Sequence, residues 1–198
     1  MEIVIASKNT GKIKEIKSFY SSLIKVKWLT FRDFKKFPDI IEKGSDFLEN
    51  ARIKAEGISN YTNKVTLADD SGLEVDFLDG GPGVMSSRYS GENATDKQNR
   101  DKLLEEMKSV KKISGRTARF VCHMVLRDPE KGCIFETRGV CEGVVGFKEK
   151  GSGGFGYDCI FIPSGYNRTM AQLTGKEKNS ISHRGEALKA LYEFIVNF

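Results

Sequence analysis

Apolar positions along the chain switch between short continuous runs and helical spacing. Residues 3–6 are continuously apolar, which is typical of a strand buried on both faces. A polar turn over 7–11 follows, and a helix is predicted after it because apolar residues recur three and four positions apart. These helical positions are Ile13, Ile16, Phe19, Tyr20 and Leu23. The order strand, loop, helix directs backbone N–H groups towards whatever occupies the loop.

A second strand is predicted over 26–29, and a second helix over 46–58, where the apolar residues keep helical spacing. Asp46 and Glu49 have the spacing of a capping box at the start of this helix. Two polar residues, one turn apart, share a face of the helix away from its apolar stripe: Asn50 and Lys54.

An acidic pair interrupts the next apolar segment. Residues 64–68 predict a strand that ends at Asp69 and Asp70, and a half-buried strand follows from residue 73. Ligands of α/β sheets bind beyond the carboxyl ends of strands. Because a divalent cation relieves the repulsion of adjacent carboxylates, a Mg²⁺ site completed by Glu42 or another acid is one interpretation. A simple turn before Gly72 is the other.

The second half of the chain predicts a helix, a long hairpin and a final helix. Thr95 and Gln98 can cap a helix that runs to about residue 108, and residues 117–127 alternate as a strand does. The remaining predicted elements are a partner strand over 133–140 that may extend to 147, a strand over 158–162 stopped by Pro163, and a helix over 187–195. Helices alternate with strands and a hairpin follows, so we predict an α/β fold with a mixed parallel and antiparallel sheet. The whole chain, 1–198, is predicted to form a single domain without a sharp internal boundary.

Composition places the chain among ordinary folded proteins. Of 198 residues, 39% are apolar and 30% charged, and this length can bury a core without disulfides. No window approaches the ~18 apolar residues of a membrane helix, and no secretory signal is evident, so we expect a cytoplasmic protein without a membrane partner. The four cysteines lack metal-ligand spacing and are predicted to be reduced packing residues: Cys122, Cys133, Cys141 and Cys159.

The net charge of +5 comes from 32 Lys and Arg against 27 Asp and Glu, without a basic tail. This charge is compatible with an enzyme for polyphosphates and with a nucleic-acid-binding module. A solvated lysine-rich surface explains it most simply.

Two loops carry candidate chemistry. The segment 7–12 combines a hydroxyl, a carboxamide, two ammonium groups and helix-start amides, all suited to an anionic oxygen, although an ordinary helix entry is equally compatible. It is not a Walker A loop. The segment 151–156 matches G-x-G-x-x-G but leads into a strand pattern, which argues against a dinucleotide-binding oxidoreductase. Its glycines allow close approach of a flat ligand, with Phe155 or Tyr157 available to stack on it.

Six motifs, taken in order, resemble the inosine/xanthosine triphosphate pyrophosphatase family over nearly the whole chain. They are Ser7-Lys8-Asn9-Thr10-Gly11-Lys12, Phe47-Leu48-Glu49-Asn50-Ala51, Ala68-Asp69-Asp70-Ser71-Gly72-Leu73, Ser87-Arg88-Tyr89-Ser90-Gly91, Gly153-Gly154-Phe155-Gly156-Tyr157-Asp158 and Ser182-His183-Arg184-Gly185. The resemblance implies hydrolysis of the non-standard purine nucleotides ITP, dITP and XTP to the monophosphate and pyrophosphate. It also implies that the mixed sheet is long and flanked by helices, that two lobes have a substrate cleft between them, and that the protein is a homodimer.

The same resemblance implies the roles of individual residues. Glu42 and Asp70 would hold Mg²⁺, and Asp70 would be the proton acceptor that activates water for attack at the α-phosphorus. Ile41 stands where some relatives carry a second acid, which leaves the outer metal ligands open. The implied triphosphate site consists of Ser7, Lys8, Asn9, Thr10, Gly11 and Lys12, with Lys54, Ser71 and Lys178 nearby. The implied base site consists of Phe155, Gly156, Tyr157, Asp158, His183 and Arg184.

Base preference would follow from hydrogen-bond donors. Hypoxanthine and xanthine present a 6-keto acceptor where adenine presents an amino donor, so donors from His183 or Arg184 would favour the former. Two alternatives stay open: a pyrophosphatase for modified pyrimidine nucleotides, and a nucleic-acid-binding module. The second gives no reason for the acidic pair, which would repel a phosphate backbone, so we expect no nucleic-acid partner.

Overall fold

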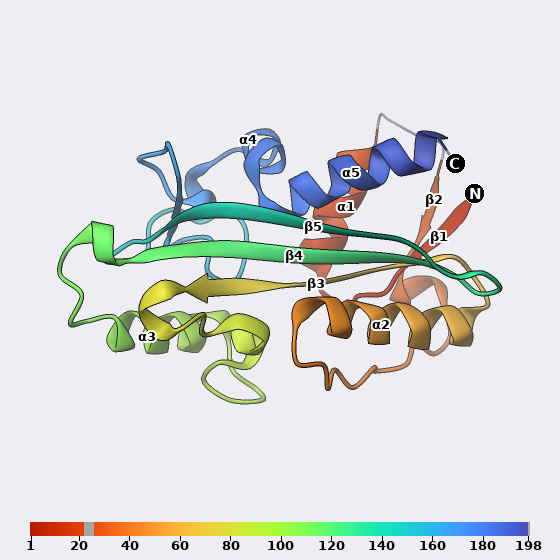
Figure 1. The fold of residues 1–198 in the computed structure, drawn as a ribbon, viewed down its shortest axis with the longest axis horizontal. Coiled ribbons are helices and arrows are strands. Elements are labelled where there is room, and N and C mark those ends of the chain that lie inside the picture. The colour runs from red at the N-terminus through yellow and green to blue at the C-terminus, as the bar shows by residue number, and fades with distance from the viewer. Residues whose placement is uncertain (22–25, 198) are drawn as a thin grey trace. The chain divides into compact units, whose positions relative to one another are not determined.

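The computed structural model describes residues 1–21 and 26–197, and these contain a six-stranded sheet in the order β2-β1-β3-β4-β5-β6 (Figure 1). The strands are β1 (Glu2–Ile5), β2 (Lys27–Leu29), β3 (Thr66–Val75), β4 (Thr117–Asp128), β5 (Gly132–Val145) and β6 (Phe161–Pro163). The helices are α1 (Thr10–Tyr20), α2 (Phe47–Thr62), α3 (Asp96–Glu106), α4 (Gly175–Ile181) and α5 (His183–Asn197). β1 pairs in parallel with β2 and β3, whereas β5 and β6 pair antiparallel. The predicted mixed α/β sheet is confirmed.

The chain divides into two compact units that interleave in sequence. Unit 1 consists of Met1–Asp70, Cys122–Gly139 and Arg184–Phe198, and unit 2 of Ser71–Val121 and Val140–His183. The chain therefore crosses between the units inside β3, β4 and β5 and at the start of α5. Because strands and a helix make these crossings, no linker composition marks them in the sequence.

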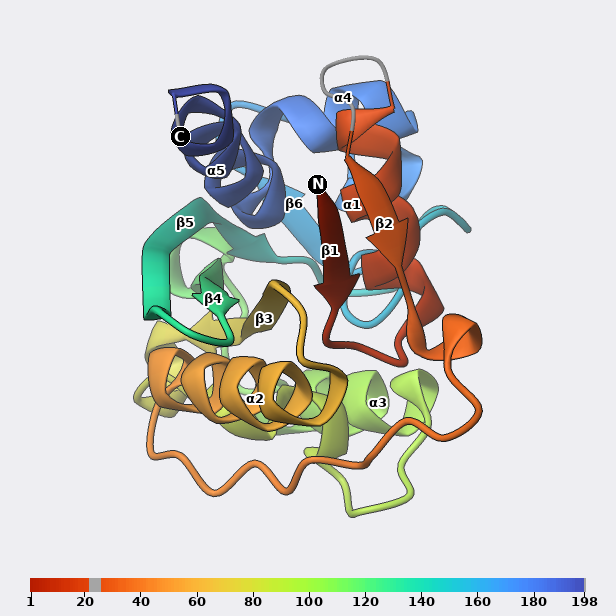
Figure 2. The ribbon, with the colours of Figure 1, turned by 90° about the vertical axis from the view of Figure 1, so that its right-hand side faces the viewer.

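Unit 1 has helices on both faces of its strands. Figures 1 and 2 show α1 and α5 on one side and α2 on the other. Ile3 and Ile5 of β1 pack in the cluster that contains α1 and α5, whereas Val4 packs in the cluster that contains α2. The Tyr20 hydroxyl of α1 donates to the Leu188 carbonyl of α5 over 2.8 Å. The continuous apolar run at the N-terminus is thus a strand buried on both faces, as predicted.

Side chains close in sequence cap the first turns of α1 and α2. Asn9 caps α1 by accepting from the N–H groups of Gly11 and Lys12, and Asp46 caps α2 by accepting from Glu49 N. The reciprocal half of the predicted capping box is wrong, because the Glu49 carboxylate accepts from Ser45 N and not from Asp46 N. The prediction for Leu23 lies outside the described residues.

Unit 2 packs α3 against the second half of β3 and parts of β4 and β5. Leu103 and Met107 join Leu73 and Val75 in its core. The predicted capping box of Thr95 and Gln98 at the start of α3 is present in both directions.

The end of unit 2 differs from the prediction in two places. The strand expected over 158–162 begins only at Phe161, because residues 157–160 form a turn in which Ile160 and Phe161 N–H groups donate to the Tyr157 carbonyl. Pro163 ends this edge strand, a position that tolerates a missing N–H. The short helix α4 was not predicted, because seven residues are too few for an apolar repeat.

Two further expectations concern the cysteines, predicted to be reduced, and membrane-spanning helices, predicted to be absent. All four cysteines are described; none forms a disulfide, and Cys122 and Cys141 are buried in the core whereas Cys133 is exposed. Within residues 1–21 and 26–197, we find no helix whose length and hydrophobicity would let it cross a bilayer.

Candidate functional site

β3 runs without interruption through the acidic pair. The prediction that Asp69 and Asp70 end a strand is wrong, since the strand spans Thr66–Val75 and both acids lie near its middle. Successive side chains of a strand point to opposite faces, so the two carboxylates serve different layers of unit 1. Both are buried, with exposed fractions of 2% and 8%. The strand continues because each carboxylate meets cations on its own side.

Asp70 faces α2. The Lys54 Nζ donates to Asp70 Oδ1 over 2.7 Å and to Glu42 Oε2 over 3.1 Å, and the Asn50 side chain donates to Asp70 Oδ2 over 3.3 Å. Burial alone would lower the pKa of Lys54, but the carboxylates of Asp70 and Glu42 outweigh it and raise that pKa. Asn50 and Lys54 do share a face of α2, as predicted, and this face covers Asp70.

Asp69 faces α1 and α5. Lys12 Nζ lies 3.0 Å from Asp69 Oδ2, and Arg184 donates to the same oxygen from Nη2 over 2.9 Å and from Nε over 3.3 Å. Arg184 Nη1 donates to Glu15 Oε2 over 2.5 Å. Burial would raise the pKa of Asp69, but the charges of Lys12 and Arg184 hold it well below its ordinary value. Different side-chain cations therefore neutralise the two acids on opposite faces of β3, and the Mg²⁺ site expected beside the acidic pair stays a prediction.

Glu42 and Asp70 form the part of unit 1 that suits a divalent cation. Their oxygens converge on one ammonium group, at 3.1 and 2.7 Å, so the fold already places two hard oxygen ligands around one positive charge. The described residues contain no cluster of three or more His, Cys, Asp or Glu side chains arranged for a metal. Mg²⁺ commonly takes one or two carboxylates and completes its shell with water and substrate phosphates, which fits this pair. Ile41 beside Glu42 is 72% exposed and offers no ligand.

The N-terminal loop is an exposed helix start. Its N–H groups at Gly11 and Lys12 donate to the Asn9 carboxamide over 2.9 and 3.1 Å, and Asn9 N donates to Ser7 Oγ over 3.1 Å. Lys8 Nζ lies 2.5 Å from Asp39 Oδ1, with both side chains substantially exposed. Lys8, Asn9 and Thr10 are exposed, so an anion could reach them after displacing these local partners.

In unit 2, Asp158 organises the glycine segment. Its Oδ2 accepts from Phe155 N over 2.9 Å and from Lys178 Nζ over 2.6 Å, and the same ammonium lies 5.0 Å from the centre of the Phe155 ring. Gly154 has φ of +73°, and a Cβ there would overlap the Asp158 carboxylate. A glycine is therefore required for the backbone and for the space.

Two aromatic residues of unit 2 differ in access. Phe155 is half-buried, whereas Tyr157 is 5% exposed, belongs to the core and donates its hydroxyl to the Ser86 carbonyl over 2.9 Å. Of the two rings expected to be available for stacking, Phe155 is therefore the more accessible, because the Tyr157 side chain is buried and its hydroxyl has a backbone partner. His183 is also buried and stacks on Phe120, with ring centres 4.8 Å apart at 13°.

Arg184 belongs to unit 1 and is 2% exposed. Its guanidinium donates to Asp69 and Glu15, which does not fit the expectation that it presents donors to a base. This arrangement favours a role in holding Asp69 and the start of α5. Sequence reasoning missed the pairing because 115 positions separate Arg184 from Asp69.

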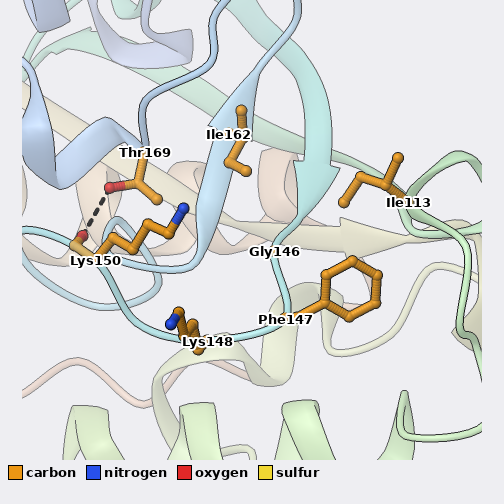
Figure 3. A pocket seen from close by; sticks show the side chains of 7 residues that line it. All are labelled: Ile113, Gly146, Phe147, Lys148, Lys150, Ile162 and Thr169. Carbon is orange, nitrogen blue, oxygen red and sulfur yellow. Dashed lines mark hydrogen bonds between the residues drawn. The ribbon is translucent and has the colours of Figure 1, made fainter.

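A separate hollow of about 170 Å³ lies in unit 2 (Figure 3). Its lining is mainly apolar, and Thr169 Oγ1 donates to the Lys150 carbonyl beside it over 2.7 Å. It is lined by Ile113, Gly146, Phe147, Lys148, Lys150, Ile162 and Thr169. None of the residues predicted to bind substrate or metal lines it.

Comparison with known proteins identifies the family of the chain. A profile of the Ham1 family matches residues 3–194. Proteins called dITP/XTP pyrophosphatase from Oceanobacillus iheyensis and Shouchella clausii are each 46% identical, over 98% of this chain and 98% and 96% of their own lengths. The solved structure of a HAM1 protein from Coxiella burnetii superposes with a TM-score of 0.88 at 40% identity, covering both chains fully. On this evidence the chain belongs to the Ham1 family.

Proposed function

We propose that this protein is a nucleoside-triphosphate pyrophosphatase that hydrolyses dITP, ITP and XTP to the monophosphate and pyrophosphate. The names of its relatives support the substrate class. The observation that carries the proposal is the meeting of Glu42, Asp70 and Lys54 at one point of unit 1. Two carboxylates and an ammonium are the groups that a metal-assisted reaction of a triphosphate needs.

Asp70 accepts the proton of the attacking water. As the water oxygen bonds to the α-phosphorus, the bond from that phosphorus to the bridging oxygen breaks and pyrophosphate leaves. Asn50 and Lys54 donate to the two oxygens of Asp70 and so fix the orientation of its carboxylate. Positioning of this kind is the main protein contribution to phosphoryl transfer.

Glu42 and Asp70 would hold the Mg²⁺ ion, which would neutralise charge that develops on the phosphates. Lys54 then lies among both carboxylates and the phosphates, and its raised pKa keeps it charged. The triphosphate is held by the exposed helix-start groups of α1, whose partners are local and displaceable. This group comprises Ser7, Lys8, Asn9, Thr10, Gly11 and Lys12, with Ser71 and Lys178 as further contacts.

Unit 2 supplies the base site. Phe155 offers its half-buried ring, and Asp158 with Lys178 holds the backbone at Phe155. Gly156 and Tyr157 contribute backbone groups to the base site. His183 supports the site through its buried stacking contact with Phe120. A site built around a hydrogen bond to the 6-keto oxygen rejects an analogue without it by roughly 10⁴-fold, because the buried donor loses its partner. Arg184, whose partners are Asp69 and Glu15, positions Asp69 and the start of α5.

The remaining features concern the cellular form of the enzyme. The chain acts as one nucleotide-pyrophosphatase domain, in the cytoplasm, as a homodimer and without nucleic acid. Cysteines that form no disulfide fit a reducing compartment.

The test is pyrophosphate release from ITP, dITP, XTP, dATP, dGTP, dCTP and UTP, with Mg²⁺ and with EDTA. We expect metal-dependent release from the first three only. Asp70→Asn should lose turnover and still bind nucleotide, while Asp76→Asn, which removes an exposed acid paired with Arg119, should behave as wild type. Release from pyrimidine nucleotides alone, or full turnover of Asp70→Asn, would contradict the proposal.

A further inference from the structure

The peptide groups of Gly156 are held by two side chains of α3. Gly156 N donates to Asp96 Oδ2 over 2.7 Å, and Arg100 Nη1 donates to the Gly156 carbonyl over 2.8 Å. Asp96 and Arg100 lie one turn apart, so both face the same side of the helix. Arg100 Nε also donates to Glu149 Oε1 over 2.8 Å, which fixes the direction of the guanidinium. Neither role was visible in the sequence, because about 60 positions separate α3 from Gly156.

The same helix holds a second segment of unit 2. Ser90 N donates to Asn99 Oδ1 over 2.8 Å, and Asn99 Nδ2 donates to the Ser87 carbonyl over 3.0 Å. Asn99 is 2% exposed, so both bonds are shielded from water. The Tyr157 hydroxyl donates to the Ser86 carbonyl, one residue away from this contact. α3 is therefore a common anchor for two loops.

Gly156 needs such an anchor. Its φ is +58°, and no atom lies within 4 Å of where a Cβ would stand, so packing around the Cα does not fix its conformation. A glycine has more backbone freedom than any other residue, and that freedom must be lost when a ligand binds. Hydrogen bonds at both its N–H and its carbonyl remove the freedom in advance, which is preorganisation.

We propose that Asp96 and Arg100 are positioning residues that fix the Gly156 peptide and thereby set the base selectivity of the enzyme. This inference rests on the proposed function, because it assumes that Phe155 and its neighbours contact the base. Asp96 and Arg100 touch neither the base nor the phosphates in this proposal. They act through the backbone that carries the Phe155 ring.

The test uses variants of α3 that remove its hydrogen bonds to Gly156. Asp96→Ala removes the acceptor, Asp96→Asn keeps a weaker one, and Arg100→Met removes the donor. Asp101→Ala is the matched control, since it deletes an acid of the same helix whose partner is the exposed Lys97. For each protein, kcat and KM are measured with dITP and dATP, together with Tm and amide exchange of the peptide that contains Gly156.

We expect Asp96→Ala and Arg100→Met to raise KM for dITP with little change in kcat. The ratio of kcat/KM for dITP over dATP should fall about tenfold or more, since a misplacement of about 1 Å can cost up to about 100-fold. The selectivity ratio of Asp96→Asn should lie between those of wild type and Asp96→Ala, and that of Asp101→Ala should match wild type. Amide exchange at Gly156 should become faster only in the clamp variants, which are Asp96→Ala, Asp96→Asn and Arg100→Met. A purely structural role would lower Tm and leave the ratio unchanged.

The outcomes separate the two proposals. A wild-type chain that hydrolyses none of the nucleotides overturns the proposed function and this inference with it. An active wild type whose selectivity ratio survives Asp96→Ala and Arg100→Met overturns only the inference. So does an exchange rate at Gly156 that is the same in the clamp variants and in Asp101→Ala.

Discussion

Replacing Asp69 by asparagine tests whether this residue holds unit 1 together. The Asp69 side chain is fully buried, and its cationic partners Lys12 and Arg184 are 14% and 2% exposed. Asparagine keeps the shape and one acceptor oxygen, but it removes the negative charge that faces the Lys12 ammonium and the Arg184 guanidinium and leaves only Glu15 to balance Arg184. Breaking a buried ion pair from one side costs about 3–5 kcal/mol, and the retained acceptor places this variant near the lower end.

That cost translates into a large change of melting temperature. In a protein of this size, 1 kcal/mol shifts Tm by about 2–4 °C, so we expect Asp69→Asn to lower Tm by roughly 6–12 °C. The control is Glu136→Gln, which breaks a pair with Arg52 whose two N–O distances are both 2.6 Å. Those side chains are 27% and 56% exposed, and such a pair contributes up to about 1 kcal/mol, so the control should lower Tm by no more than about 4 °C.

The assay is thermal unfolding by circular dichroism at pH 7 in low salt, without nucleotide or metal. The exposed pair of Glu136 and Arg52 has shorter N–O distances than the buried contacts of Asp69. A larger loss of stability in Asp69→Asn would therefore be due to burial and not to a shorter distance. Equal shifts in Asp69→Asn and Glu136→Gln would refute the reasoning. A stabilised Asp69→Asn would refute it as well.

Three further predictions concern other parts of the chain. Gly154→Ala should lose most dITP turnover at unchanged metal dependence, because a side chain there meets the carboxylate behind it and φ is +73°; steady-state kinetics checks this. Hydrogen bonds from the backbone N–H of Thr174 and from Arg168 lower the pKa of Glu177 from 4.5 to about 2. The ionised Glu177 therefore stabilises α4 above about pH 4.5, and this stabilisation is lost as the pH falls towards 2. The amide exchange rates of α4 in wild type and in Glu177→Gln should converge over that pH range. Burial above all raises the pKa of Cys122 to about 12, so iodoacetamide at pH 8 should modify the exposed Cys133 in the folded protein and Cys122 only after unfolding, as mass spectrometry would show.

Local patterns predicted most of the elements and the first turn of several helices. The apolar run of β1, the helical spacing of α1 and α2 and the capping box of α3 depend on residues within a few positions of each other. The strand break predicted at Asp69 and Asp70 is wrong because the partners of these acids lie far away in the sequence. Two adjacent acids look like a turn unless their partners are known, and Arg184 lies 115 positions from Asp69.

For the candidate site, too, local sequence patterns predicted only part of what the structure shows. Motifs indicated which residues belong to it, but not which of them are accessible. Tyr157 and Arg184 carry groups that could contact a base, yet both are buried with backbone or carboxylate partners. Their partners come from distant segments, and only the folded chain brings these together. Spacing in a sequence cannot show whether a donor is already engaged.

Asp69 and Asp70 show how a fold gives neighbouring residues of one type different tasks. Strand alternation sends Asp69 towards Lys12 and Arg184, which both contact its Oδ2, and Asp70 towards Lys54, where its side chain keeps an exposed fraction of 11%. The Asp69 side chain is fully buried and two cations balance its charge, whereas the Asp70 side chain is partly exposed and shares one ammonium with Glu42, which supports the proposal that Asp70 binds the metal ion and activates the water. The alternation of one strand therefore makes Asp69 a partner of α1 and α5, and the proton acceptor that we propose is the other acid, Asp70.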